Sequence, residues 1–149
     1  MPDWFLRAAT ADDAHWIAEL RAVVLRADLE RLGRFDPTRV RQRFLSAFDP
    51  AATRVVVAGG RDVGSISVRL EDHALWIEHF YLVPGLQGRG IGSRVLKAHL
   101  ASAAAGLPVR LNVLQGSRAR ALYERNGFVV ESEDPVDVFM VRHPVVRTS

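Results

Sequence analysis

A glycine-rich run, Gln87-Gly88-Arg89-Gly90-Ile91-Gly92, separates an apolar stretch at residues 74–83 from an amphipathic stretch at residues 93–105. The first stretch is typical of a strand and the second of a helix. Glycines at such a junction let the backbone turn sharply and let a ligand approach it closely. The first N–H groups of a helix lack internal partners and lie at the positive end of its dipole. The run therefore predicts a strand–turn–helix unit with an anion site, most often for phosphate.

The hydrophobic pattern around this junction predicts a mixed α/β fold. Thr10, followed by acidic residues, marks the start of a helix that continues to about Leu32, and a second helix follows. The period then changes to that of an antiparallel meander of three strands, and the turn, a helix, a strand, a helix and two strands follow. A mostly antiparallel sheet of about seven strands, with helices on both faces, would bury these segments.

The composition is that of one ordinary globular domain spanning residues 1–149, with 48% hydrophobic and 25% charged residues. The chain has no cysteine, which excludes disulfides, thiolate zinc sites and a cysteine nucleophile. We expect no metal. The sequence shows neither a secretory leader nor an apolar stretch long enough to span a bilayer, so we expect a cytoplasmic protein without a membrane partner.

The basic residues are almost all arginines, and they are interspersed with acids. The net charge is +3 and the isoelectric point is about 10.1, yet a run such as Arg26-Ala27-Asp28-Leu29-Glu30-Arg31 alternates in sign. Nucleic-acid binding favours clustered basic residues with interleaved aromatics. The pattern therefore favours a solvated mixed surface with no nucleic-acid partner, and the small positive excess suits an anionic small ligand.

Other interpretations of the glycine-rich run fit less well. A Walker A loop requires Gly-Lys-Ser/Thr, which is absent. The dinucleotide fingerprint requires Gly-x-Gly-x-x-Gly in a βαβ unit, whereas here the glycines are spaced Gly88-x-Gly90-x-Gly92 after an antiparallel meander. A tight turn without a ligand remains the alternative.

With a second motif, Leu122-Tyr123-Glu124-Arg125-Asn126-Gly127-Phe128, the chain resembles the GNAT superfamily of acyl-CoA N-acyltransferases. The glycine-rich run is similar to the family's Arg/Gln-x-x-Gly-x-Gly/Ala pyrophosphate loop and follows a strand ending Tyr81-Leu82-Val83-Pro84. The second motif is similar to the family's Leu-Tyr-Glu-x-x-Gly-Phe run. The resemblance implies a sheet splayed at its middle and an N-acetyltransferase that uses acetyl-CoA as co-substrate.

The resemblance also implies the contacts with acetyl-CoA. Backbone N–H groups from Gln87 to Gly92, with Ser93, would surround the pyrophosphate, and Arg89 could contact a phosphate directly. Arg118 or Arg120 could meet the 3′-phosphate. A bulge near the end of the preceding strand would free backbone donors of Leu82 and Val83 for the pantetheine arm and the thioester oxygen.

Two side chains are implied in the chemistry. Tyr123 would protonate the departing thiolate, because a tyrosine hydroxyl with its ordinary pKa near 10 keeps its proton at neutral pH. Glu78 interrupts an apolar strand and would accept the amine proton, directly or through water; His79, also polar but expected on the opposite face, is the alternative base. Each could instead have only a structural role.

One departure from the family pattern concerns the helix that carries Tyr123. The family often has an asparagine just before this helix, whereas this chain has Gly116-Ser117. Ser117 could cap the helix and contact the cofactor, and Asn112 on the preceding strand is another candidate contact.

The amine acceptor, a small molecule or a peptide, would bind against the first two helices, residues 76–80 and the final strands. Charged candidates on the first helix are Arg21, Arg26, Asp28 and Arg31, and apolar candidates are Trp16, Phe35 and Trp76. The alternatives are a transferase for a longer acyl-CoA and a GNAT-fold sensor that binds acyl-CoA without chemistry. A homodimer is a further expectation, since dimers are common in the family.

Overall fold

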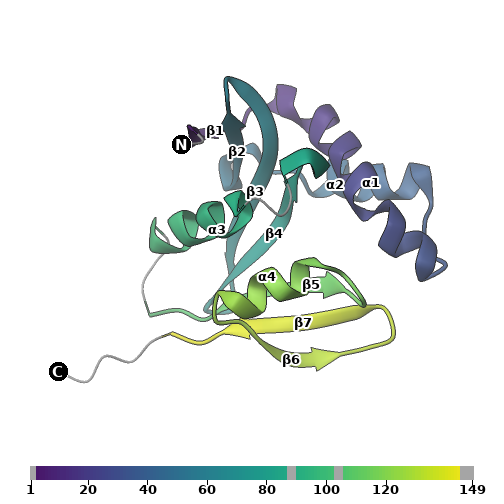
Figure 1. Ribbon diagram of the computed structural model, residues 1–149, viewed down its shortest axis with the longest axis vertical. Coiled ribbons are helices and arrows are strands. Elements are labelled where there is room, and N and C mark those ends of the chain that lie inside the picture. Colours follow the sequence, from purple (N-terminus) through teal and green to yellow (C-terminus); the bar gives the residue numbers. More distant parts are fainter. Residues whose placement is uncertain (1–2, 87–89, 103–105, 145–149) are drawn as a thin grey trace. The chain divides into compact units, whose positions relative to one another are not determined.

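The structure is a computed structural model that describes residues 3–86, 90–102 and 106–144 (Figure 1). It divides into two compact units, one formed by Met1–Val68 with Glu78–Gln87 and the other by Arg69–Ile77 with Gly88–Ser149. Strands β3 (Arg61–Glu71) and β4 (Ala74–Leu82) contribute residues to both units.

The first unit begins with β1 (Trp4–Ala8) and continues through α1 (Ala14–Arg31), α2 (Pro37–Ala47) and β2 (Thr53–Ala58). A short 3₁₀ turn, Ala11–Asp13, leads into α1, and its Asp13 carboxylate accepts the Thr10 amide at 2.9 Å. Thr10 therefore caps this turn, whereas the expected helix itself begins at Ala14, directly after Asp13. Helix α2 begins at Pro37, where the Asp36 carboxylate accepts the amides of Thr38 and Arg39 at 3.0 and 2.9 Å, respectively. A proline in the first turn and an acidic cap before it are both favourable at a helix start.

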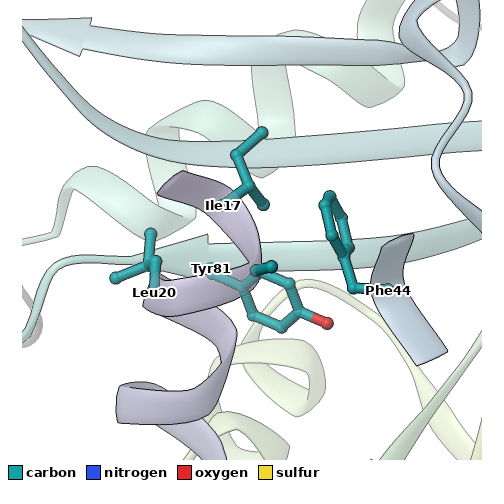
Figure 2. Close-up of a cluster of buried hydrophobic side chains, with 5 residues drawn as sticks. Ile17, Leu20, Phe44 and Tyr81 are labelled. Atoms are coloured by element: carbon teal, nitrogen blue, oxygen red, sulfur yellow. The ribbon is translucent and has the colours of Figure 1, made fainter. Parts of the chain in front are cut away.

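An apolar cluster in the first unit joins both helices to β4. Ile17 and Leu20 of α1 and Phe44 of α2 surround Tyr81 of β4, as Figure 2 shows. Ile17 and Phe44 are fully buried, and Tyr81 is 8% exposed. The helical spacing of the apolar residues in α1 therefore matches the face that it packs against β4.

The second unit contains helices α3 (Ile91–Ser102) and α4 (Ala119–Arg125) and strands β5 (Val109–Leu114), β6 (Val129–Glu133) and β7 (Asp137–Arg142). Its most deeply buried side chains are Val95, Leu96, Leu111, Phe128, Val138, Met140 and Val141. Asp72 and His73, both with positive φ, form the two-residue turn between β3 and β4. Positive φ at both positions is typical of a type I′ hairpin turn.

The strands are hydrogen-bonded in the order β1-β2-β3-β4-β5-β7-β6. Strand β4 pairs with β5 in parallel at only two positions, Leu75 with Val109 and Trp76 with Arg110. The antiparallel pairing of β5 with β7 extends over six positions, from Val109 opposite Arg142 to Leu114 opposite Asp137. The short parallel ladder in a largely antiparallel, seven-stranded mixed α/β sheet confirms the expected fold class.

Candidate functional site

Strand β4 is distorted at His79, where φ is +51°. A non-glycine residue in this left-handed region is uncommon inside a strand and interrupts the alternation of side chains. The Ser65 hydroxyl of β3 donates to the His79 carbonyl oxygen at 2.7 Å and stabilises this conformation. The regular alternation that was expected to place Glu78 and His79 on opposite faces therefore does not continue through this point.

Beyond the distortion, strands β3 and β4 approach each other closely. At Gly64 an added Cβ would lie 2.3 Å from the Tyr81 carbonyl oxygen and 2.7 Å from Leu82 Cδ2, so the position requires glycine. One residue earlier, the Val63 carbonyl accepts the Val83 amide at 2.9 Å. The expectation that Val83 has a free backbone donor is therefore wrong, because β3 follows β4 past the distortion and pairs with it there.

The His79 ring lies against the first unit's helices. It makes an edge contact with Phe44 of α2 at a centroid distance of 4.9 Å, and its Nδ1 is 3.2 Å from the Tyr81 hydroxyl. Burial raises the pKa of Tyr81 to about 12; the positive charge of Arg21 opposes this shift, and the negative charge of Glu78 adds to it. The first unit thus brings Arg21, Glu78, His79 and the neutral Tyr81 hydroxyl to one polar region beside the apolar cluster.

The second unit holds the start of the helix that follows the glycine-rich run. Gly90 has φ of +79° and immediately precedes α3, and its carbonyl accepts the Arg94 amide at 3.2 Å. Ile91, Gly92 and Ser93 occupy the first turn, where backbone N–H groups have no partner within a helix. The expected contacts of Gln87, Gly88 and Arg89 lie outside the described residues.

A hydrogen bond joins the two motifs within this unit. The side-chain amide of Asn126, which ends α4, donates to the Ser93 hydroxyl of α3 at 3.1 Å and to the Leu122 carbonyl at 2.8 Å. Tyr123, which precedes Asn126 by one turn, is 6% exposed, and its ring packs edge-on against Phe128 at 5.6 Å. The first turn of α3 and the helix that carries Tyr123 are therefore fixed to each other.

The other expected cofactor contacts have protein partners. The Ser117 hydroxyl accepts the Ala119 amide at 3.1 Å, so it stabilises the start of α4 as expected, although Arg118 is the residue directly before the helix. The Asn112 side chain donates to the Asp137 carboxylate of β7 at 3.0 Å. Arg120 lies 3.7 Å from Glu124 of the same helix.

Most of the charged candidates on α1 form ion pairs along the helix. Arg26 pairs with Glu30 and lies over the Phe35 ring, 5.0 Å from its centroid. Arg31 pairs with Asp28 at 2.6 Å. These pairs indicate an ordinary charged helix face. Arg21 differs from the other three candidates because it takes part in neither of these pairs.

Trp76 lines an open hollow of about 350 Å³ in the second unit. The Arg69 guanidinium lies 5.6 Å from the centroid of its ring, and Arg110 binds the Glu131 carboxylate at 2.9 and 3.1 Å. Phe139 completes the apolar side of the hollow. Trp76 is therefore half-buried, with the Arg69 guanidinium over its ring.

Sequence comparison identifies the family. A profile of the acetyltransferase (GNAT) domain matches residues 51–130, more than half of the chain. The chain belongs to the GNAT acetyltransferase family. The matched region includes both motifs and the distorted part of β4. A search among curated protein sequences finds no significant match.

Solved structures show the same GNAT fold. The PaiA N-acetyltransferase of Thermoplasma acidophilum, solved in complex with coenzyme A, has a TM-score of 0.74 at 18% identity, over 95% of this chain and 99% of that one. A GNAT acetyltransferase of Streptococcus agalactiae has a TM-score of 0.74 at 14% identity, over 96% of both chains. An acetyltransferase of Thermus thermophilus has a TM-score of 0.73 at 18% identity, over 95% and 97% of the respective chains.

Two residues of the GNAT domain that shape β4 were not expected from sequence, namely Gly64 and Ser65. The available signal was a glycine inside an alternating strand, since an isolated glycine there often marks a close backbone approach. Across the described ranges, no helix is both long and apolar enough to cross a bilayer.

Proposed function

We propose that this GNAT domain is an N-acetyltransferase that moves the acetyl group of acetyl-CoA to a primary amine by direct attack in a ternary complex. The observation that carries the proposal is the hydrogen bond from Asn126 to Ser93, because it ties the first turn of α3 to the helix of Tyr123. The second unit would thus carry both the anion site, at that first turn, and the proton donor, Tyr123.

In the proposed reaction the amine nitrogen attacks the thioester carbon, and the carbonyl electrons move to oxygen. Glu78 accepts a proton from the attacking nitrogen. The intermediate then collapses, the carbon–sulfur bond breaks, and Tyr123 protonates the departing thiolate of coenzyme A. The products are an amide and free coenzyme A. The first-turn N–H groups of Ile91, Gly92 and Ser93 would hold the pyrophosphate.

The distorted segment of β4 supports the assignment of Glu78. The backbone turns at His79, the residue directly after Glu78. The negative charge of Glu78 helps to raise the pKa of the buried Tyr81 hydroxyl. A carboxylate in this partly apolar region is suited to accept the proton that the attacking nitrogen carries once its bond to the thioester carbon has formed. His79 is already engaged with Tyr81 and Phe44, which favours a structural role for its ring.

The test is a thiol-release assay with acetyl-CoA and a panel of amines, amino acids and peptides, repeated with longer acyl-CoA esters. Transfer to at least one amine supports the proposal, and the ester with the highest kcat/KM identifies the donor. Saturable binding of acetyl-CoA without thiol release from any acceptor would contradict it and favour a sensor.

Glu78 has its own test within the same assay. Glu78→Gln should lower kcat and abolish the acidic limb of the pH–rate profile, because the amide cannot accept the proton. The control is Glu30→Gln, which removes the same charge from the exposed ion pair with Arg26 on α1. A pH profile of Glu78→Gln that coincides with the wild-type profile would exclude Glu78 as the base.

A further inference from the structure

Arg21 is the charged residue within the apolar face of α1. Ile17 and Leu25 lie one turn before and one turn after it, and both pack in the cluster that contains Tyr81 of β4. Arg21 itself is half-buried. Its guanidinium therefore extends from the face of α1 that contacts β4, whereas the other candidate arginines of this helix are exposed.

The Nε–H group of Arg21 is buried and has no hydrogen-bond partner among the residues that the structure describes. The neighbouring carboxylates on α1 are bound elsewhere: Glu19 pairs with Arg41 at 2.7 Å, and Asp28 pairs with Arg31. Leaving a buried donor of a charged group unpaired is costly, and such a group in a native structure calls for an explanation. A ligand that accepts from Arg21 would remove this cost.

The charge of Arg21 acts in the same region as the proposed base. Arg21 and Glu78 both act electrostatically on the Tyr81 hydroxyl, with opposite effects on its pKa. The first unit therefore presents a positive and a negative side chain beside one buried phenol. A molecule with an amine and an anionic group would complement both charges.

We propose that Arg21 binds an anionic group, a carboxylate or a phosphate, on the same small molecule whose amine is acetylated, so that the acceptor is an amino acid or a phosphorylated amine rather than a polyamine or a simple alkylamine. This inference rests on the proposed function. Guanidinium binds both anions through paired, charge-assisted hydrogen bonds. Glu78 faces the amine end of the acceptor, and Arg21 holds the other end.

The experiment compares acceptors that differ only in their anionic group. Phenylalanine is compared with phenylalaninamide and phenethylamine, and phosphoethanolamine with ethanolamine, in the thiol-release assay with acetyl-CoA. We expect the wild type to favour the anionic member of at least one set, and the two sets distinguish carboxylate from phosphate. Equal or higher kcat/KM for the neutral members of both sets would overturn the inference.

The decisive variant is Arg21→Met, which keeps an unbranched apolar stem and removes the charged guanidinium group. It should lower kcat/KM for the anionic acceptor by about 10- to 100-fold and leave the neutral partner within about threefold. The control is Arg43→Gln, which removes a charge from an exposed position on α2. It should leave kcat/KM unchanged for both the anionic and the neutral acceptor. A uniform loss across charged and neutral acceptors would show that Arg21 has only a structural role.

Thermal unfolding gives a readout that does not depend on turnover. The melting temperature of Arg21→Met should equal or exceed that of the wild type, because the substitution removes an unpaired buried donor. Phenylalanine and phosphoethanolamine are each added without acetyl-CoA, and at least one of them should raise the melting temperature of the wild type and not that of Arg21→Met. Absence of thiol release with this binding intact would reject the proposed function alone. Equal stabilisation of both proteins, or of neither, would reject the role of Arg21.

Discussion

At the scale of single residues, the backbone conformation of His79 has the largest consequence for the site. Its positive φ breaks the alternation of β4, and Ser65 stabilises it through the carbonyl oxygen. Side chains before and after His79 therefore do not follow the faces that a regular strand would give them. The residue types around it could be read from the sequence, but their orientation could not.

Tyr123→Phe tests the proposed general acid. The variant should lower kcat by about 10²-fold or more and leave the dissociation constant of acetyl-CoA unchanged, because only the transferable proton is lost. Steady-state kinetics at saturating substrates, together with acetyl-CoA titration, would measure the two effects separately. Circular dichroism and the melting temperature serve as controls for the fold. Unchanged kcat would exclude Tyr123 as the acid.

Asp13→Asn tests a partly buried ion pair in the first unit, formed by Asp13 and Arg7. Asp13 is 5% exposed, accepts two hydrogen bonds from Arg7 at 2.7 and 3.0 Å and one from the Trp16 indole at 2.8 Å. Removing one charge of such a pair should lower the free energy of unfolding by about 3 kcal/mol at pH 7. The control is Asp62→Asn, since Asp62 binds the same arginine but is exposed, and the expected loss there is below about 1 kcal/mol.

The same pair predicts a pH dependence of stability. The hydrogen bonds from Arg7 hold the pKa of Asp13 well below its usual value of 3.8, so its contribution is present above that pH and is lost as the pH falls further. Urea unfolding between pH 5 and pH 2 should therefore show a smaller decline for Asp13→Asn than for the wild type. Parallel declines would contradict this assignment.

At the scale of elements, many boundaries could be predicted because their signals are local. The helix expected to continue to about Leu32 ends at Arg31, and the expected second helix occupies Pro37–Ala47, since caps and breakers lie within a few residues. Helix α4 begins only at Ala119, because Ser117 forms the turn before it. The approach of β3 to β4 depends on partners distant in sequence.

Gly64→Ala tests that approach. The new methyl group would overlap the Tyr81 carbonyl and Leu82, so the backbone of β4 must shift, and the free energy of unfolding should fall by about 1–3 kcal/mol. The matched control is Gly85→Ala, where a Cβ meets nothing within 4 Å and φ is not positive. That substitution should be neutral or slightly stabilising in urea unfolding. Equal effects of the two substitutions would contradict the close approach.

At the scale of the whole molecule, part of the arginine excess is balanced by local ion pairs. In the described part of the chain, Arg7, Arg26, Arg31, Arg41, Arg69, Arg110 and Arg120 each lie beside a carboxylate. Their charges are therefore neutralised at short range, even though the net charge is +3. This arrangement supports the expectation that nucleic acid is not a partner.

Fluorescence anisotropy with duplex DNA tests this expectation across a range of salt concentrations. We expect no binding tighter than the roughly 10⁻⁴–10⁻⁶ M that is typical of non-specific contacts at physiological salt, because the basic residues are interspersed with acids rather than clustered. The same titration at low salt is the control for weak electrostatic attraction. Tighter binding with a steep dependence on salt would contradict the prediction.

The sequence by itself determined the order of the elements, the family and the two motifs, because periodicity, caps and glycine spacing are encoded within short segments. Only the tertiary structure decided which polar groups are engaged. It pairs the Val83 amide with Val63, joins Asn126 to Ser93, and buries the Nε–H group of Arg21 without a partner among the described residues. Hydrogen bonds and burial depend on segments that meet only when the chain folds, so no local pattern records them.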